Sequence, residues 1–237
     1  MRPIGFSTGA IAKGDFRRAL ELMAPFGMPA VELSALRLHE LPHLAEAADD
    51  LPLAGYRHIS VHAPSDFGTG EEQRVVSLLR GLADRGWFIV LHPDVIFTDA
   101  LWIDFGDKLL IENNDRRKSV GRTASEIKAL YGRLPKAGLC FDIGHARQVD
   151  PTMNEAYLIL QQGRARLSQV HMSEVNSFSR HDPLSAAAIE ASRSVAYLVP
   201  EHIPIILESL IDKGQSSIKT ELHRASEALT SLVPVPI

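Results

Sequence analysis

The stretch GLCFDIGHA, residues 138–146, joins a run of apolar side chains to two residue types that bind metals, Asp142 and His145. A strand that is buried on both faces is apolar throughout, and here the apolar run stops at a carboxylate. The same arrangement recurs along the chain in HISVHAP (58–64), FIVLHPD (88–94), KLLIENN (108–114), LSQVHMSE (167–174) and IPIILES (203–209). Such strand ends meet in one place only if the strands are parallel and share a face. That is the geometry of a barrel with its active site at the carboxyl ends of the strands.

Strand and helix patterns alternate along the whole sequence. The predicted strands are Pro3–Ser7, Ala30–Ser34, His58–His62, Phe88–His92, Lys108–Glu112, Gly138–Asp142, Leu167–His171 and Ile203–Glu208. Apolar residues at helical spacing predict helices at Phe16–Phe26, Gln73–Ala83, Ala124–Leu134, Asn154–Gln162, Ala186–Leu198 and Thr220–Leu232, and a short helix within Asp94–Phe105. Asp15 and Thr123 are the expected N-caps, and Gly27 and Gly86 the expected helix stops.

This succession of βα units nearly exhausts the chain and predicts a single α/β domain over residues 1–237, a (β/α)₈ TIM barrel. A doubly wound open sheet is the rival fold. It places its functional residues near one topological switch point. Polar residues end most of the predicted strands here, which favours closure into a barrel.

The composition narrows the class of protein. The 237-residue chain is 45% hydrophobic and 23% charged, with a net charge of -4. This balance gives no general attraction to nucleic acid or to an anionic membrane, so we expect a small-molecule substrate and leave a homo-oligomer open. The single cysteine, Cys140, excludes an internal disulfide and favours a reducing compartment. The sequence has neither a long apolar span nor the features of a secretory signal, and we therefore expect a cytoplasmic protein.

Four of the strand-end residues predict a metal site: Glu112, Asp142, His171 and Glu208 end the fifth to eighth predicted strands. Neighbouring strands lie about 5 Å apart, so that these side chains can converge on one ion. Three carboxylates and one imidazole suit Mn²⁺, Mg²⁺, Co²⁺ or Zn²⁺. A lone strand-end residue is more simply bonded to a loop, but four charged groups at one depth would crowd one another without compensation.

Further histidines extend this cluster. His62 and His92 end the third and fourth strands beside Glu112. Either these three residues bind a second ion, or the two histidines are neutral and bind substrate. His145, three residues beyond Asp142, is a candidate ligand, acid or substrate contact. His181 lies in the polar loop SFSRHDPLS, where a histidine is commonly just solvated.

The order of these motifs resembles the xylose isomerase-like TIM-barrel superfamily, which includes sugar isomerases, sugar epimerases and endonuclease IV. The resemblance covers essentially the whole chain and rests on HAP (62–64), LHPD (91–94), IEN (111–113), CFDIGHA (140–146) and PIILES (204–209). In the epimerases, residues matching Glu112, Asp142, His171 and Glu208 hold one metal, and the two glutamates move a proton on either side of the substrate carbon. The pattern His-x-x-Glu-x-Asn of these enzymes is matched by residues 171–176.

The resemblance also implies a set of substrate contacts. Those expected are Glu32, His62, Glu174, Arg180 and His181, with Glu112, Glu208 and His145 as catalytic groups. The arginine that usually follows the epimerase pattern is Ser177 here, and Arg180 is the nearest candidate.

Resemblance to the endonuclease IV branch implies more metal ions than the single ion of the epimerases. There, residues matching His62, His92, Glu112, Asp142, His171 and Glu208 bind two zinc ions. A third zinc uses the residue matching His145 and an Asp-x-His pair, which reads Ser179-Arg180-His181 in this chain.

Two functions follow from these alternatives. The leading expectation is a divalent-metal-dependent isomerase or epimerase acting on a small sugar, sugar phosphate or related hydroxy-carbonyl compound by metal-assisted proton transfer, with one ion and room for a second. The alternative is a phosphodiester hydrolase with two or three zinc ions. The negative net charge and the lack of a clear set of inserting aromatic side chains oppose a duplex substrate.

Overall fold

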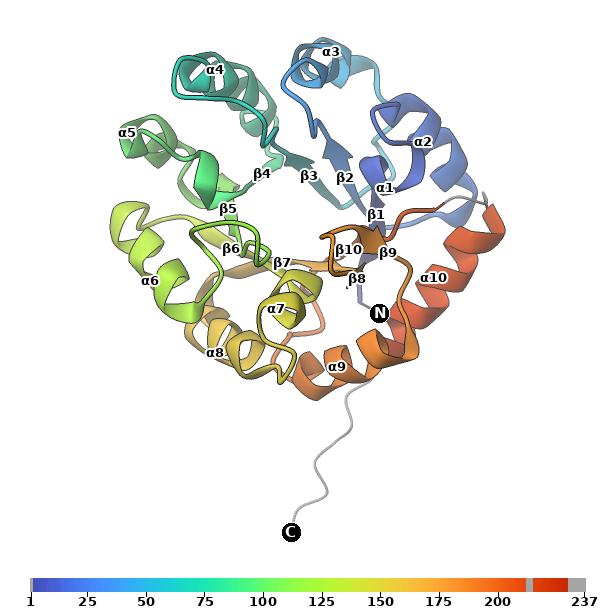
Figure 1. Cartoon of the computed structure of the whole chain (residues 1–237). Coiled ribbons are helices and arrows are strands. Elements are labelled where there is room, and N and C mark those ends of the chain that lie inside the picture. The colour runs from blue at the N-terminus through green and yellow to red at the C-terminus, as the bar shows by residue number, and fades with distance from the viewer. Residues whose placement is uncertain (1, 212–214, 230–237) are drawn as a thin grey trace.

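Eight parallel strands close into a barrel in the computed structural model, which describes residues 2–211 and 215–229 (Figure 1). Around the barrel the strands follow the order β1, β10, β7, β6, β5, β4, β3, β2. Their bounds are β1 Ile4–Ser7, β2 Ala30–Ser34, β3 His58–His62, β4 Phe88–Leu91, β5 Leu109–Glu112, β6 Gly138–Asp142, β7 Leu167–Met172 and β10 Ile205–Leu207. The predicted TIM barrel is therefore confirmed, and each predicted strand is present with its bounds within two residues.

Helices surround the barrel, most of them as an outer layer, with α1 and α7 closer to the strands (Figure 1). They are α1 Thr8–Ala12, α2 Phe16–Met23, α3 Glu40–Ala47, α4 Glu72–Ala83, α5 Asp99–Trp102, α6 Ala124–Arg133, α7 Ile143–Val149, α8 Asn154–Gly163, α9 Ala186–Ala196 and α10 Gln215–Ala228. Short 3₁₀ turns occupy Ala24–Phe26, Ala48–Asp50, Pro93–Val95, Ile103–Lys108 and Arg164–Arg166. None of the helices in the described residues combines the length and apolarity needed to cross a membrane.

The expected helix boundaries hold where the chain has a cap. Asp15 accepts a hydrogen bond from the backbone N–H of Arg18, and Thr123 forms a capping box with Glu126 at the start of α6. Gly27 ends the 3₁₀ turn Ala24–Phe26 that follows α2, with a φ of 56°. This is the left-handed conformation that glycine adopts without steric cost.

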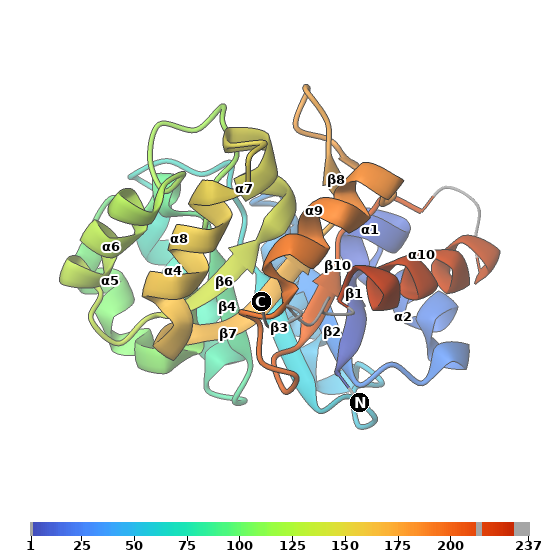
Figure 2. The same ribbon diagram turned by 90° about the horizontal axis from the view of Figure 1, so that it is seen from below.

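Five elements were not predicted: the helices α1, α3 and α7, and the two strands of an antiparallel hairpin, β8 (Glu174–Val175) and β9 (His181–Asp182). All are short or lie directly against a strand end, so they carry little periodic signal. The hairpin projects from the same end of the barrel as α7 (Figure 2). The final predicted helix begins earlier, at Gln215, and positions 230–232 of that prediction lie outside the described residues.

The register of the strands arranges the side chains of the barrel interior in layers. Ser34 pairs with His62 and Glu32 with Ser60, and alternate residues of a strand face the same side. Residues two positions before the rim therefore form a layer beneath it. One part of that layer is apolar, formed by Val90, Leu110 and Cys140, and another part is polar.

Candidate metal centre

Four side chains from four strands meet at the carboxyl end of the barrel: Glu112 (β5), Asp142 (β6), His171 (β7) and Glu208 (after β10). One ligand atom of each lies within 4.8 Å of the others. Nδ1 of His171 lies 3.1 Å from Oε1 of Glu112 and 3.5 Å from Oε2 of Glu208. Glu112, Asp142 and His171 are fully buried. The structure thus brings together the set that the strand-end pattern placed at one site.

The donor set of this cluster fits a divalent ion, since carboxylate oxygens and an imidazole nitrogen are ligands of Mn²⁺, Mg²⁺, Co²⁺ and Zn²⁺. Oδ1 of Asp142 accepts a hydrogen bond from the His145 N–H at 2.6 Å, whereas Oδ2 accepts none from the described residues. Burial raises the pKa of Asp142, although the nearby His145 opposes that shift. A buried carboxylate oxygen without a partner is costly, and a bound cation would remove that cost.

A second group of ligand types shares Glu112. Nε2 of His62 lies 3.1 Å from Oε2 of Glu112, and Nε2 of His92 lies 3.5 Å from the same oxygen. The other ring nitrogens are occupied, because Nδ1 of His62 donates to the Ala63 carbonyl and Nδ1 of His92 donates to Oδ1 of Asn114. Such outer contacts fix a ring so that Nε2 faces the site. Glu112 therefore belongs to two groups of candidate ligands.

A third group consists of Asp142, His145 and His181. Nδ1 of His145 lies 3.5 Å from Oδ2 of Asp142. The Ser179 hydroxyl lies 2.9 Å from Nε2 of Gln148. Ser179, which stands where the endonuclease IV pattern has an aspartate, is not part of this group. The carboxylate of the group is that of Asp142.

The hairpin brings His181 to the site. Val175 pairs with His181 and Glu174 with Asp182, so the chain reverses direction between them and returns His181 to the side of Val175. Gly144 permits the close packing beneath: a Cβ at this position would lie 2.6 Å from the Val175 side chain and 2.8 Å from a backbone oxygen. A larger residue at Gly144 would push the start of α7, and with it the neighbouring His145, away from the rim.

The two glutamates of the first cluster have opposite pKa shifts. Burial favours the neutral form of Glu112, but His92 and His171 outweigh it and hold the pKa of Glu112 well below its usual range. Burial raises the pKa of Glu208 to about 8, and the neighbouring carboxylates Glu112 and Asp142 act in the same direction. In the metal-free protein Glu112 is therefore the more acidic of the two carboxyl groups, and Glu208 holds its proton to a higher pH.

Two histidines of the site, His62 and His181, also have opposite pKa shifts. Burial opposes a charge on His62, yet its contact with Glu112 raises its pKa to about 9. Burial lowers the pKa of His181 to about 3, with His145 adding to the effect. His181 is therefore neutral across the physiological range and has a lone pair available.

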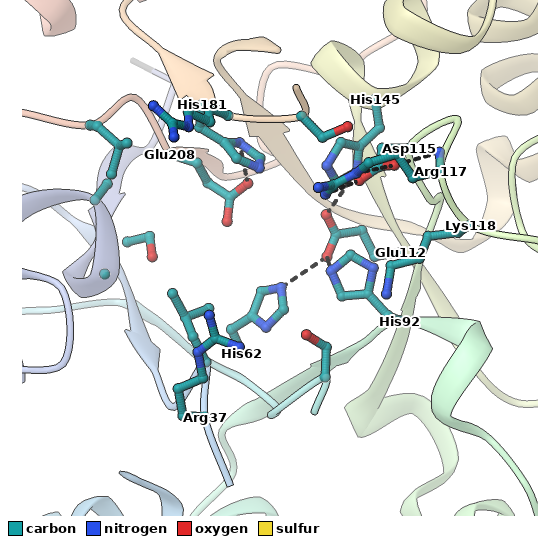
Figure 3. A pocket seen from close by; sticks show the side chains of 18 residues that line it. Arg37, His62, His92, Glu112, Asp115, Arg117, Lys118, His145, His181 and Glu208 are labelled. Atoms are coloured by element: carbon teal, nitrogen blue, oxygen red, sulfur yellow. Dashed lines mark hydrogen bonds and ion pairs between the residues drawn. The ribbon is translucent and has the colours of Figure 1, made fainter. Parts of the chain in front are cut away.

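A cavity of about 550 Å³ opens above these groups (Figure 3). Its floor is formed by His62, His92, Glu112, His145, His181 and Glu208. Figure 3 shows Glu112 and Glu208 facing one another across this space.

Four cationic side chains line the outer part of the cavity: Arg37, Arg117, Lys118 and Arg180. Arg117 and Lys118 are paired with Asp115 at 2.8 Å and with Asp94 at 2.6 Å. Arg37 lies 3.9 Å from an aspartate, and the Arg180 guanidinium has no hydrogen bond or ion pair within the described part of the chain. The last two are the cations available to a ligand.

The expected substrate contacts divide into two groups. His62, Arg180 and His181 line the cavity. Glu32 and Glu174 do not: Glu32 is fully buried one layer below the rim, and Glu174 is bound to Arg147 at 2.6 Å on the outside of the site. The register of β2 explains the first case, because Ser34 rather than Glu32 lies at the level of His62.

The sequence patterns did not single out Arg37 or Gln169. Arg37 follows β2 by three residues in a loop that reads as ordinary surface. Gln169 lies inside β7, two residues before His171, and is fully buried. A glutamine within an otherwise apolar strand was the signal that could have revealed a polar interior.

Comparison with solved structures supports the fold. The chain is similar to 3-keto-D-glucoside 4-epimerase from E. coli, with 13% identity, a TM-score of 0.58 and coverage of 96% of this chain and 99% of that one. It is also similar to a putative sugar phosphate isomerase/epimerase from Anabaena variabilis, with 15% identity, a TM-score of 0.56 and coverage of 94% and 88%. A dipeptide epimerase from Methylococcus capsulatus, complexed with Mg ion, matches at 13% identity and a TM-score of 0.53, over 89% of this chain and 56% of that one.

These likenesses confirm the TIM-barrel fold that the sequence resemblance implied. No protein-family model and no curated protein matches the sequence.

Proposed function

We propose that this chain is a divalent-metal-dependent isomerase or epimerase that acts on a small anionic hydroxy-carbonyl compound, the class that includes sugar phosphates. One observation carries the proposal: Glu112 and Glu208 belong to the same candidate ligand cluster and face one another across the cavity floor (Figure 3). Two carboxylates on either side of a bound carbon can remove and return its proton.

A bound divalent ion would polarise the substrate carbonyl and its neighbouring hydroxyl, which makes the adjacent C–H acidic. Glu112, the ionised carboxylate, accepts the proton. Glu208, once its cavity-facing oxygen has taken a proton from solvent, returns that proton to the opposite side of the carbon (Figure 3). Environments that push two carboxylates apart in pKa are typical of acid–base pairs, and in the metal-free protein the pKa of Glu112 is lowered while that of Glu208 is raised.

The other polar groups of the floor orient the reactants. Oε2 of Glu208 lies 3.3 Å from Nδ1 of His181, and the second Glu208 oxygen turns into the cavity (Figure 3). His145 stands beside Asp142 and is the next candidate for proton transfer, since it reaches the same part of the floor. Its Nδ1 donates to the Asn113 carbonyl at 2.9 Å, which holds the ring in place.

The anionic character of the substrate is inferred from the outer part of the cavity. The side chain of Arg37 is 63% exposed, and Arg180 is exposed and has no carboxylate partner within the described residues. A guanidinium binds phosphate or carboxylate through paired hydrogen bonds. One structural neighbour is named as a putative sugar phosphate isomerase/epimerase, and sugar phosphates belong to this anionic class.

A second candidate function is metal-dependent hydrolysis of a phosphoester, favoured by the cluster of His62, His92 and Glu112. A mononuclear isomerase does not require these histidines. Glu112 is shared between this cluster and the first, which is the arrangement of a two-metal site that holds the attacking and the leaving oxygen.

The test of the proposal is exchange of a substrate C–H with solvent. Metal-loaded protein in D₂O would be mixed with a panel of aldoses, ketoses and their phosphates, and deuterium incorporation followed by proton NMR. We expect exchange next to the carbonyl of at least one phosphorylated compound, abolished by chelator. Chelator-sensitive cleavage of a phosphodiester such as bis(p-nitrophenyl) phosphate, with no exchange in the panel, would establish the hydrolase instead.

A further inference from the structure

We propose that Glu32 is a positioning residue for the metal ligand His171, holding its Nε2–H so that the Nδ1 lone pair faces the ligand cluster. The inference rests on the proposed metal centre and extends it to a residue that touches neither the cavity nor the ion. It does not depend on which reaction the centre performs.

The two nitrogens of the His171 ring face different surroundings. Nδ1 points to the rim, 3.1 Å from Oε1 of Glu112 and 3.5 Å from Oε2 of Glu208. Nε2 points into the barrel, 2.9 Å from Oε2 of Glu32. Neither His171 nor Glu32 is exposed to solvent. A metal binds the neutral form of imidazole, in which only one nitrogen carries a proton, so a hydrogen bond from Nε2 to Glu32 leaves Nδ1 as the ligand atom for a metal.

Glu32 is itself held in place. The Ser60 hydroxyl and the Gln169 amide donate to the same oxygen, Oε2, at 3.0 Å and 2.7 Å. The carbonyl of Gln169 accepts from Nε2 of His58 at 2.6 Å. Because that contact occupies the Gln169 oxygen, its NH₂ group faces Glu32.

His58 anchors this network at the other end of the barrel. It lies at the start of β3, and its ring stacks on Phe88 at a centroid distance of 5.2 Å. The hydrogen-bonded series His58, Gln169, Glu32 and His171 therefore runs through the polar part of the interior layer. Carboxylates that hold a ligating histidine are a common outer contact of metal sites.

The burial of Glu32 is otherwise unexplained. A carboxylate without exposure is costly unless paired, and its second oxygen, Oε1, accepts no hydrogen bond from the described residues. The same layer can be filled by apolar side chains, since Val90, Leu110 and Cys140 pack together in another part of it. Packing alone therefore does not require a carboxylate at position 32. A role at His171 accounts for the retained charge.

One competing arrangement uses the same atoms. Nε2 of Gln169 lies 2.8 Å from Nε2 of His171. If the amide donated to that nitrogen, the proton of the ring would sit on Nδ1 and would block the metal. The two arrangements differ in which ring nitrogen carries the hydrogen, and this is measurable.

The experiment combines metal affinity with the protonation of the ring. Zinc affinity of the full chain would be measured by competition with a chromophoric chelator for the wild type, Glu32→Gln and Glu72→Gln. Glu72 is the matched control, because it is a buried carboxylate that accepts three hydrogen bonds, from Phe97, Thr98 and Trp102, none of them a candidate ligand. The ring nitrogens of His171 would be assigned in the zinc form by ¹⁵N-edited NMR.

We expect Glu32→Gln to weaken zinc binding by about 10- to 100-fold, with Glu72→Gln within twofold of the wild type and all three proteins folded by circular dichroism. We also expect a proton on Nε2 and none on Nδ1 in the zinc form. Unchanged affinity in Glu32→Gln, or a proton on Nδ1, overturns the positioning role. A wild type that binds no zinc overturns the metal centre and this inference together, whereas normal zinc binding without isomerase activity would count against the proposed reaction alone.

Discussion

Nδ1 of His171 lies 3.1 Å from Oε1 of Glu112, although 59 residues separate them and their strands, β7 and β5, are not neighbours. Strand β6 lies between them and contributes Asp142 to the same cluster. The contact exists only because the sheet curves into a barrel and turns the strand ends inward. The candidate centre is thus a product of barrel closure.

Replacing Asp142 by Asn is expected to weaken metal binding without loss of the fold. The amide keeps an oxygen for the His145 N–H at the start of α7, so the helix cap remains. It loses the negative charge at Oδ2, and we expect affinity for Mn²⁺ or Zn²⁺ to fall by more than about tenfold, since outer-shell changes alone have effects of that size. Calorimetric titration and thermal unfolding of the metal-free protein check the two parts. Unchanged affinity would remove Asp142 from the ligand set.

Glu208→Gln is expected to separate metal binding from proton transfer. The amide retains one weak oxygen ligand but cannot act as an acid or base. Metal should remain partly bound, while deuterium exchange of the substrate falls by about 10²-fold or more. The exposed Glu201 provides the matched control, Glu201→Gln. Normal exchange in the Glu208 variant would show that another group, with His145 next in line, transfers the proton.

Metal affinity should rise with pH. Burial raises the pKa of Glu208 to about 8, and Glu112 raises that of His62 to about 9, so both groups hold a proton at neutral pH. A ligand must lose its proton to bind an ion, and binding therefore releases protons and strengthens as pH increases toward these values. Between pH 6 and pH 8 we expect more than about a tenfold gain in affinity. Calorimetry in buffers of different ionisation enthalpy measures the proton release, and pH-independent binding would contradict the assignment of Glu208 as a ligand.

Duplex DNA should not bind appreciably. The net charge is -4, and non-specific affinity for DNA comes mainly from neutralised phosphates. Fluorescence anisotropy with an intact and an abasic duplex at physiological salt should show no saturable binding. Tight, salt-sensitive binding of the abasic duplex with chelator-sensitive cleavage would instead favour the hydrolase.

Much of the barrel was predictable because its strands are continuous apolar runs that end in polar residues. His62, Glu112 and Asp142 lie at the last position of their strands, and the structure places all three at the rim. The depth of Glu32 was not predictable from the same rule. Glu32 stands in the middle of β2, and only the register, which pairs it with Ser60, shows that it lies a layer below.

The hairpin of β8 and β9 could not be predicted from sequence patterns, for a different reason. Strands of two residues carry no alternation to detect, and the loop SFSRHDPLS reads as solvated. Its fold depends on tertiary contacts, including the hydrogen bond from Gln148 to the Asn176 carbonyl at 2.6 Å. His181 reaches the cavity through this hairpin, while Glu174 turns toward Arg147.

The most direct test of the account is anomalous diffraction from a crystal of the protein soaked in Mn²⁺. We predict an anomalous peak surrounded by Glu112, Asp142, His171 and Glu208, with ligand distances of about 2.0–2.3 Å. The proposed metal centre, and the chemistry built on it, would be contradicted if a crystal soaked in saturating Mn²⁺ showed anomalous peaks only at surface carboxylates and none within this cluster.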